Sequence, residues 1–523
     1  MRGAIAAGHP LTAEAGARVL AEGGNAVDAC IAAAFASWVT ESPLTGPGGG
    51  GFMLVHRGHD RGARLLDFFV DVPGRGLEPH ERLAMDDIDV SFGDSNQIFH
   101  IGGPSCTVPG APAGLEEAHR AFGTLPWREL LTPAIELARK GVELNRAQAY
   151  LHAILDLILR HTDEGRALYS KDGERLVAGD RLVMTDLAGT LELLAERGAK
   201  ELYSGELGRA MVEHVRAGGG DITEEDLSAY RVIWRRPVAV SFLGRVFLSN
   251  PPPSSGGVLI GYGLRLLDAL RFVVDAPAGS ADAMVALVEA MREQTRVRTD
   301  AFAAELYRGG LVKRLLADDS IAEGAERMRA HLEGRPEVAG APGTTHIAVV
   351  DAAGNAASCT ASTGSGSGLI VPGTGLHVNN MLGEYDLVAA RVKPGMRLTS
   401  MMAPSLVLHG DRPRLVVGSA GSVRLRGAIL QIVLNVIQHE LPVEEALERP
   451  RIHFEDPHVH CEGGTDAAEM DRLEAMGYDV TRWRRKNLFF GGAAAVEVRE
   501  DGSLAAAGDP RRGGAGVVVE RTS

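Results

Sequence analysis

The spacing of hydrophobic and polar positions divides the chain into a largely helical first part and a strand-rich last part. Apolar residues recur every three or four positions over residues 13–22 and 26–39, as they do along one face of an α-helix. The same spacing returns in two amphipathic segments, 133–141 and 185–198. We therefore predict that most of the region 110–235 is helical.

Capping residues mark the ends of the first two helices. Thr12 is a candidate N-cap for the first, because its hydroxyl can accept a hydrogen bond from a backbone N–H of the first turn. Gly23 and Gly24 then end that helix, since glycine adopts a left-handed conformation without strain. Asn25, with Asp28 three residues later, has the form of a capping box. A short turn is therefore expected between the two helices.

The pattern changes after a segment rich in Pro, Gly and Ala at 336–343. Before it, an irregular loop at 251–257 leads into helix that continues to about residue 332. After it, short runs of β-forming and small residues predominate, with one helix predicted at 425–437. The predicted strands are 345–350, 356–362, 405–409, 414–418, 493–499 and 515–519. This order is compatible with two domains, and equally with a sandwich of sheets flanked by helices.

Composition and charge narrow the classes of function. The 523 residues are 45% hydrophobic and 23% charged, which is ordinary for a soluble globular protein. The formal net charge of −14 argues against a nucleic-acid partner, because no basic excess is present to neutralise phosphates. We interpret the short basic cluster 482–486 as the solvated end of a strand. No apolar run reaches the roughly 18 residues that span a bilayer, so no membrane partner is expected.

The N-terminal sequence and the cysteines bear on the compartment. The residues after Met1 lack the form of a signal peptide, so the chain as given is expected to be cytoplasmic. Four cysteines in so long a chain do not make a disulfide framework. Cys30 lies in an apolar predicted helix and Cys359 in a predicted strand, so we expect both to be buried small residues.

Two patterns raise the question of a bound cofactor or metal. The glycine run 46–51 follows a predicted helix and precedes the apolar strand 52–55. A dinucleotide-binding loop has the opposite order, strand before and helix after, so close backbone approach beside a site is the preferred interpretation. The other pattern is the cluster His453, His458, His460 and Cys461. No further ligand motif completes it, so we expect structural histidines, no metal and no cofactor.

The most informative single residue is Thr344, which stands at the start of the predicted strand 345–350. Threonine often opens a strand for conformational reasons alone. If the bond between Gly343 and Thr344 were cut, however, the same residue would carry both a hydroxyl nucleophile and a free α-amine. An α-amine titrates near 7.7–8.0 and can take the hydroxyl proton at neutral pH. Both interpretations are open at this point.

The register of the following hairpin gives Thr344 a candidate partner. Residues 352–354 make a three-residue loop with glycine at the left-handed position. If Asp351 faces Asn355, paired positions sum to 706, and position 344 lies opposite Ser362. Side chains directly opposite each other in an antiparallel pair approach closely enough for two hydroxyls to interact.

Several blocks of sequence, in order along nearly the whole chain, resemble the γ-glutamyltranspeptidase family of self-cleaving N-terminal nucleophile hydrolases. The blocks are Gly23 to Ala29, Gly48 to Phe52, Val108 to Gly110, Asp226 to Tyr230, Pro251 to Gly257, Gly343 to His346, Asn379-Asn380, Gly418 to Gly421 and Gly508 to Arg512. The resemblance implies an α+β fold, a four-layer αββα sandwich of the N-terminal nucleophile hydrolase type. It also implies no cofactor.

The resemblance further implies self-cleavage between Gly343 and Thr344, giving a large subunit 1–343 and a small subunit 344–523 that remain one folding unit. Thr344 is then the nucleophile and its own amine the base. The acyl-enzyme is resolved by water or by an amine acceptor. Ser362 matches a hydroxyl that assists the nucleophile. Gly421 and Ser422 match the oxyanion-hole pair, which is usually two glycines, and donate through backbone N–H groups.

The substrate-binding positions are only partly retained. Glu384 matches the acidic residue that binds the substrate's α-amine, Thr399 and Ser400 match two serines that bind its carboxylate, and Asn380 is assigned to the same site. Phe69, in contrast, stands where the family carries an arginine for that carboxylate. An aromatic ring does not replace a bidentate guanidinium.

Two further positions differ, and three functions therefore stay open. Gly364 replaces an Asn and Met381 a Gln or Glu, and the short segment after Glu384 suggests that a lid loop is absent. The first function is a γ-glutamyltransferase and glutathione hydrolase, with Arg75 or Arg397 supplying the missing cation. The second is an acylase of the cephalosporin or glutaryl type, with an apolar wall at residue 69. The third is an unprocessed scaffold without catalysis.

The resemblance also bears on the compartment, because many members of the family are exported.

Overall fold

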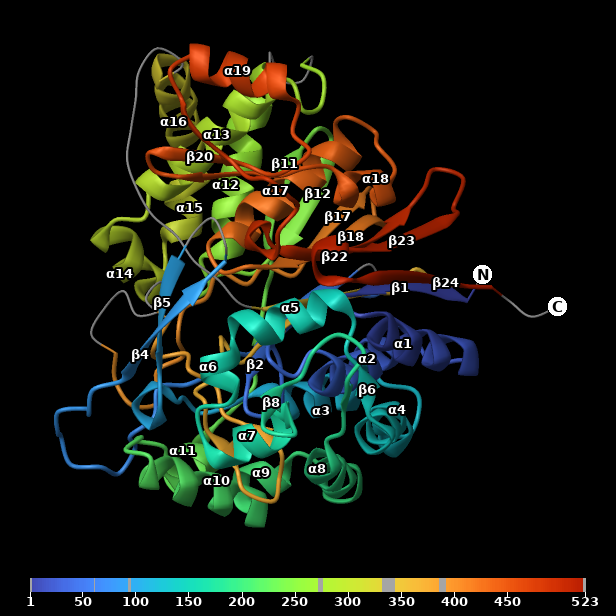
Figure 1. Cartoon of the computed structure of the whole chain (residues 1–523). Coiled ribbons are helices and arrows are strands. Elements are labelled where there is room, and N and C mark those ends of the chain that lie inside the picture. The colour runs from blue at the N-terminus through green and yellow to red at the C-terminus, as the bar shows by residue number, and fades with distance from the viewer. Residues whose placement is uncertain are drawn as a thin grey trace.

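The computed structural model describes residues 2–60, 62–92, 96–270, 276–331, 344–384 and 392–520. The fold is of the α+β class, with helices and two large sheets (Figure 1). The N- and C-terminal strands of the described chain lie side by side in one of these sheets, as β1 (Gly3–Ala7) and β24 (Ala515–Val519). Each sheet combines strands from both sides of residue 344, which does not fit a division into an early helical domain and a late strand domain.

The first sheet has seven strands in the order β10-β3-β2-β14-β13-β1-β24. The remaining bounds are β2 Gly50–His56, β3 Ala63–Phe68, β10 Ile233–Arg235, β13 Thr345–Asp351 and β14 Ala356–Ser362. The central pair is the hairpin predicted from the sequence. Strand β1 pairs with β13 although its sequence is only Gly, Ala and Ile, so tertiary pairing outweighs its weak β-propensity.

The second sheet has six strands in the order β11-β12-β17-β18-β22-β23. Their bounds are β11 Val238–Phe242, β12 Arg245–Ser249, β17 Ser405–His409, β18 Arg412–Ala420, β22 Gly492–Val498 and β23 Leu504–Gly508. Its strands β18 and β22 contact β13 of the first sheet. The predicted strands of the last part of the chain agree with the observed ones to within two residues at each end.

Helices cover both sheets (Figure 1). One set packs on the first sheet: α1 Pro10–Glu22, α2 Ala26–Thr40 and α3 Ala111–Phe122, with α4 Trp127–Lys140 and α8 Thr185–Arg197 behind them. Another set packs on the second sheet: α12 Gly256–Ala269 and α17 Arg424–Ile437, joined by α13 Ala281–Arg296 and α16 Asp318–His331. The long helix expected up to about residue 332 is thus several helices, which include α14 Asp300–Arg308.

Alternation along β13 decides which way its side chains point. Ile347 belongs to the hydrophobic cluster formed with α1 and α2, whereas Ala348 belongs to the cluster that includes the second sheet. Successive side chains of a strand point to opposite faces. Thr345 therefore shares the helical side with Ile347, and Thr344 belongs to the row that faces the second sheet.

The helix ends agree with the sequence in two places and differ in one. The capping box of Asn25 and Asp28 is present, and Gly23 ends α1 with φ +100°. The prediction of Thr12 as N-cap was wrong, because α1 begins earlier and the His9 side chain accepts from the Leu11 N–H at 3.2 Å. The Thr12 hydroxyl instead lies 2.6 Å from that of Thr40 at the end of α2.

Other predictions concern cysteines, histidines and surface charge. Cys30 and Cys359 are buried, as expected. His460 accepts the indole N–H of Trp483 at 3.1 Å in the three-stranded sheet of β19 Ile452–Glu455, β20 His458–Cys461 and β21 Asp479–Arg482. Arg482 ends β21 and pairs with acidic residues of α19 (Ala467–Ala475). Among the described residues, none of the helices is long and apolar enough to cross a membrane.

Candidate active site

The candidate site lies where four neighbouring strands of the first sheet have their ends. Thr344 immediately precedes β13, and Ser362 ends β14. Gly50 begins β2 opposite Ser362, and Phe68 ends β3 opposite the next residue of β2. Because the strands are antiparallel and adjacent, these positions lie along one edge of the sheet. Residues far apart in the sequence therefore meet there.

The hairpin has the register predicted from the sequence. Thr345 pairs with Ala361 and Val350 with Ala356, and Gly354 occupies the left-handed position with φ +77°. Continued by one pair, this register sets Thr344 beside Ser362. The Ser362 Oγ accepts the backbone N–H of Gly364 at 2.8 Å. Both residues are almost fully buried.

The glycine run 46–51 packs against the backbone of this site. A side chain at Gly49 would collide with the carbonyl oxygen of Ser362, and one at Gly51 with that of Thr360. The Gly49 carbonyl accepts the N–H groups of Gly110 and Ala111 at the start of α3. The run therefore serves close backbone approach, as preferred from the sequence, and a strand, β2, follows it.

Gly421 and Ser422 lie between β18 and α17, at the end of the second sheet that meets β13. A side chain at Gly418 would collide with the ring of His346, so the end of β18 packs against the start of β13. Gly421 has φ +122° and Ser422 φ +49°. A left-handed serine is uncommon and normally signals a conformation that glycine would supply. The backbone at this pair thus keeps the shape expected of two glycines.

The loop after β14 brings Gly364, Asn380 and Glu384 together. A side chain at Gly364 would collide with Asn380 Oδ1 and lie 3.1 Å from Glu384 Oε1. Asn380 Oδ1 accepts the Ser365 N–H at 2.9 Å, and its Nδ2 donates to Ser365 Oγ at 2.8 Å and to the His100 carbonyl at 3.2 Å. Asn380 therefore braces the loop, and its contact with substrate stays a prediction.

Thr399 and Ser400 lie against the loop 251–257. The Thr399 hydroxyl donates to the Pro253 carbonyl at 2.6 Å. Ser400 Oγ accepts the Met402 N–H at 3.0 Å. The neighbouring Leu398 N–H binds the Val70 carbonyl at 3.1 Å, which sets these hydroxyls beside the segment of Phe69. Among the described residues, the Thr399 hydroxyl thus acts as a donor and the Ser400 hydroxyl as an acceptor.

Phe69 is part of the hydrophobic core. Its side chain is fully buried and stacks on Phe52, with ring centroids 5.4 Å apart. Its backbone is fixed by Asp67 Oδ1, which accepts the Phe69 N–H at 3.0 Å, and by the Tyr230 hydroxyl, which donates to the Phe69 carbonyl at 2.7 Å. The position at which the resemblance expects a substrate-binding arginine is therefore occupied by a core residue.

Arg397 is not a free cation beside the site. Its Nε donates to Asp71 Oδ1 at 2.7 Å and its Nη1 to Asp67 Oδ1 at 2.8 Å, while Nη2 donates to the Arg231 carbonyl at 2.7 Å. Arg75 lies 3.9 Å from the buried Asp226 carboxylate. Both arginines proposed from the sequence as the missing cation thus already pair with carboxylates.

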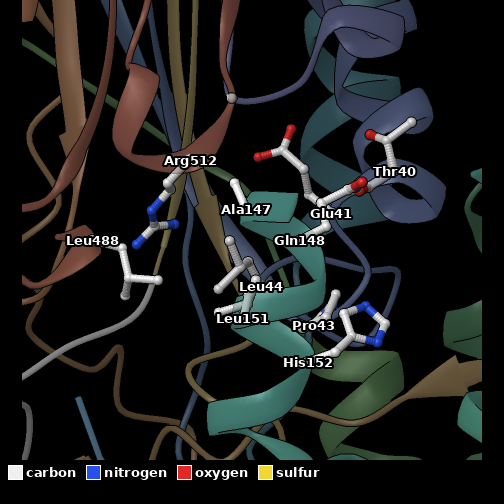
Figure 2. Close-up of a pocket in the computed structure, with 11 residues that line it drawn as sticks. Thr40, Glu41, Pro43, Leu44, Ala147, Gln148, Leu151, His152, Leu488 and Arg512 are labelled. Atoms are coloured by element: carbon white, nitrogen blue, oxygen red, sulfur yellow. The ribbon is translucent and has the colours of Figure 1, made fainter. Parts of the chain in front are cut away.

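Two charged residues that sequence reasoning did not select lie behind Thr344. Arg512 Nη1 donates to the carbonyl oxygen of Thr344. Glu41 Oε2 accepts the Thr345 hydroxyl proton at 2.5 Å. Figure 2 shows Arg512 and Glu41 bordering one cavity, lined also by Leu44, Gln148 and Leu151. Arg512 belongs to the sequence block Gly508 to Arg512 that carries the family resemblance. Nothing in the sequence around Glu41 indicates its role, because its partner Thr345 is 304 residues away.

The chain is similar to several known proteins over nearly its whole length. The family model for gamma-glutamyltranspeptidase matches residues 12–519. The Acylase ACY 1 proenzyme of Pseudomonas sp. (strain V22) is 33% identical, covering 99% of this chain and 94% of that protein. The glutathione hydrolase proenzyme of Escherichia coli (strain K12) is 31% identical, covering 98% and 90%. The crystal structure of cephalosporin acylase from Bacillus halodurans has a TM-score of 0.81 at 25% identity, covering 100% and 96%.

The family match and the fold define an enzyme of the N-terminal nucleophile hydrolase type. The chain belongs to the gamma-glutamyltranspeptidase family, whose members are hydrolases and transferases. At about 30% identity its similar relatives include both acylases and glutathione hydrolases.

Proposed function

We propose that the chain is a self-processing amide hydrolase whose nucleophile is Thr344, and that its acyl substrate is of the acylase type rather than γ-glutamyl. Gly343, the other side of the proposed cleavage, lies outside the described residues. The proposal includes a four-layer αββα arrangement made by a large subunit 1–343 and a small subunit 344–523. The names of two relatives, each called a proenzyme, support processing.

In the proposed reaction the Thr344 amine takes the hydroxyl proton and the oxygen attacks the amide carbonyl. Ser362 assists the nucleophile by hydrogen bonding. The backbone N–H groups of Gly421 and Ser422 bind the oxyanion, a contribution commonly worth about 3–4 kcal/mol for each donor. Water, or an amine acceptor, then releases the acyl group. The left-handed backbone at both residues supports the oxyanion role.

The observation that carries the choice of substrate is the stacking of Phe69 on Phe52 in the core. A γ-glutamyl group has an α-carboxylate, and charge-assisted hydrogen bonds to such a group contribute about 1.5–3 kcal/mol each. Residue 69 supplies none, Arg397 is committed to Asp67 and Asp71, and the Thr399 proton goes to Pro253. An acyl group without that carboxylate does not need these contacts.

A γ-glutamyl amide, as in glutathione, is the second candidate. It is favoured by the retention of Glu384 and Ser400. Glu384 lies beside Gly364 in the loop that follows Ser362, where an acidic group can meet an α-ammonium. In this candidate the Ser400 hydroxyl, which accepts the Met402 N–H, would donate its proton to the carboxylate. Glu384 and Ser400 alone, without the arginine, would bind a γ-glutamyl group weakly. This predicts a high KM for such substrates.

Two experiments test these proposals. Intact mass spectrometry of purified wild-type protein should give two fragments of 343 and 180 residues, and Thr344→Ala a single chain. The Thr132→Ala variant, at a half-buried threonine of α4, is the control and should be cut normally. An uncut wild-type chain would exclude the mechanism. Parallel assays on glutaryl, aliphatic acyl and γ-glutamyl anilides then decide the substrate, since faster turnover of the γ-glutamyl anilide would reverse the choice made above.

A further inference from the structure

The first two residues of the small subunit are held by two charged side chains from distant parts of the chain. Arg512 donates to the main-chain carbonyl of Thr344, and Glu41, just after α2, accepts the side-chain hydroxyl proton of Thr345. Thr12 Oγ1 donates to the other carboxylate oxygen of Glu41 at 3.2 Å. The backbone that carries the proposed nucleophile is therefore held by one contact to its carbonyl and one to the next side chain.

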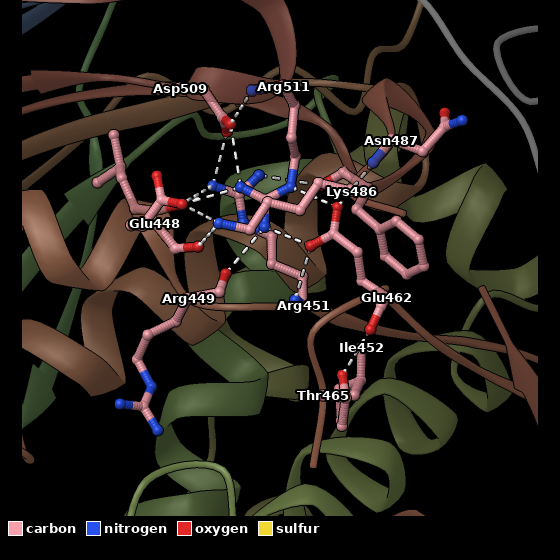
Figure 3. A network of polar contacts seen from close by, with 12 residues as sticks. Glu448, Arg449, Arg451, Ile452, Glu462, Thr465, Lys486, Asn487, Asp509 and Arg511 are labelled. Carbon is pink, nitrogen blue, oxygen red and sulfur yellow. Dashed lines mark hydrogen bonds and ion pairs between the residues drawn. The ribbon is translucent and has the colours of Figure 1, made fainter. Parts of the chain in front are cut away.

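A buried ionic network fixes the backbone from which Arg512 projects. Arg512 ends the short helix η4 (Pro510–Arg512), whose N-cap Asp509 accepts the Arg511 N–H at 3.0 Å. Figure 3 shows Asp509 and Arg511 bonded to the side chains of Arg451 and Glu462. All four side chains are at most 3% exposed. A charged network so enclosed leaves the segment before Arg512 little freedom to move.

The path of the Arg512 side chain depends on a glycine of the second sheet. A Cβ atom on Gly492, the first residue of β22, would collide with the aliphatic part of Arg512. Gly492 pairs with Ala420, the residue before Gly421. The route from η4 to Thr344 thus passes beside the start of β22, which is paired with the end of the strand that leads to the proposed oxyanion hole.

Arg512 is a positive charge at this point. Burial lowers its pKa to about 10, so the guanidinium is still protonated at neutral pH. Burial also raises the pKa of Glu41, which weakens the negative charge across the same cavity (Figure 2). The carbonyl of Thr344 therefore faces a cation that is at most partly offset.

Resting on the cleavage proposed before Thr344, we propose that Arg512 is a positioning residue for the nucleophile. Its guanidinium fixes the Thr344 carbonyl and, as a fixed positive charge, keeps the α-amine of the same residue in its neutral, basic form. The amine nitrogen and the carbonyl oxygen belong to one residue, so the guanidinium lies within a few ångströms of the amine. A like charge that close disfavours protonation, and only the unprotonated amine can act as base.

Other titratable groups on the surrounding elements set the background. These are Glu41 after α2, His346 on β13, His377 and Glu384 around the loop after β14, Arg424 on α17, and Asp509 beside η4. Burial lowers the pKa of His346 to about 3 and that of His377 to about 4, so both are neutral during catalysis. Glu41 opposes Arg512 only as far as it is ionised. Asp509 is neutralised by Arg451 and Arg511. Glu384 and Arg424 are unchanged in the variants compared below.

The test separates charge from hydrogen bonding with two variants of the full chain. Arg512→Gln keeps an N–H donor but no charge, whereas Arg512→Lys keeps the charge. We expect the acidic limb of the kcat/KM pH profile to move up by roughly one pH unit in Arg512→Gln, with about tenfold lower activity below pH 7. Arg512→Lys should keep the wild-type limb with a lower kcat. The exposed Arg499→Gln should behave as wild type in both respects.

Three results would overturn the proposal. The first is a kcat/KM pH profile of Arg512→Gln whose acidic limb lies at the wild-type pH. The second is an acidic limb that moves by the same amount in Arg512→Gln and Arg512→Lys. The third needs no variant: the Thr344 amine of wild-type protein, measured by pH-dependent labelling of the new N-terminus, should have a pKa below the 7.7–8.0 of ordinary α-amines. A value at or above that range excludes the role of Arg512 even if the variants do not fold. An uncut wild-type chain would instead reject the proposed function.

Discussion

Phe69 stacks on Phe52 with ring planes inclined by 24°, and the pair lies in the core that includes the facing sides of the two sheets. This places residue 69 among apolar neighbours, although its backbone lies at the end of β3 beside the site. The consequence is that a single substitution at 69 should not convert the substrate preference of the chain.

We predict that Phe69→Arg destabilises the protein without raising γ-glutamyl turnover. A guanidinium in this core would have no partner and would lose its hydration, which is a severe cost. Phe69→Leu, which keeps an apolar side chain, should cost only about 1–2 kcal/mol. Thermal melting combined with the γ-glutamyl and acyl anilide assays checks this. A stable Phe69→Arg protein with a lowered KM for the γ-glutamyl anilide would contradict the assignment of residue 69 to the core.

A second prediction compares two glycines that share a left-handed backbone but differ in surroundings. Gly364 has φ +71° and lies against Asn380 and Glu384, whereas Gly354 has φ +77° and has open space around it. Alanine at either position should cost about 1 kcal/mol of stability from its backbone conformation. Only Gly364→Ala should also displace Asn380 and raise KM. Equal KM values for the two variants would show that the loop does not contact substrate.

The parts of this architecture that the sequence predicts are those fixed by near neighbours. The hairpin register follows from Gly354 and its three-residue loop, and the capping box of Asn25 from a residue three positions away. Local signals fail where the partner is remote. Thr345 meets Glu41 across 304 positions, and Arg397 meets Asp67 across 330. Arg397 consequently looked like a spare cation in the sequence, although in the fold two carboxylates neutralise it.

Removing that buried cation should be costly. We predict that Arg397→Met destabilises the protein by about 3–5 kcal/mol, because Asp67 and Asp71 would remain buried beside each other without the guanidinium that they share. Asp67 would keep one partner, Arg235, at 2.7 Å. Adding Asp71→Asn to Arg397→Met should recover part of the loss, and denaturant unfolding of the single and double variants measures it. If the losses in free energy of unfolding from Arg397→Met and Asp71→Asn simply add in the double variant, the side chains of Arg397 and Asp71 are not coupled.

Ser422 offers a prediction in the opposite direction. With φ +49° it has a strained backbone that glycine adopts freely. Ser422→Gly should therefore be neutral or stabilising by up to about 1 kcal/mol, and kcat should be retained because the proposed oxyanion donor is a backbone N–H. Ser422→Val should lose both stability and kcat, since a β-branched residue is poorly tolerated at this φ. A large loss of kcat in Ser422→Gly would instead assign the function to the hydroxyl.

Buried histidines give the protein a pH-dependent stability whose sign can be worked out. Burial lowers the pKa of His346 to about 3 and that of four others to about 4; these are His9, His152, His377 and His460. In the unfolded chain histidine titrates near 6.5. Between about pH 6.5 and 4 the unfolded state therefore binds more protons than the folded one, and stability must fall as pH falls.

Each such histidine contributes a slope of up to about 1.4 kcal/mol per pH unit. We predict that the free energy of unfolding, measured in guanidinium chloride, drops steeply between pH 6.5 and 4.5. His152→Gln should reduce this slope by up to about 1.4 kcal/mol per pH unit, the contribution of one histidine. The reason is that His152 lies almost fully buried beside the cavity of Arg512. His59, whose side chain is 73% exposed, is the control, and His59→Gln should leave the slope unchanged. A profile that is flat over this interval would mean that these histidines are protonated in the folded protein.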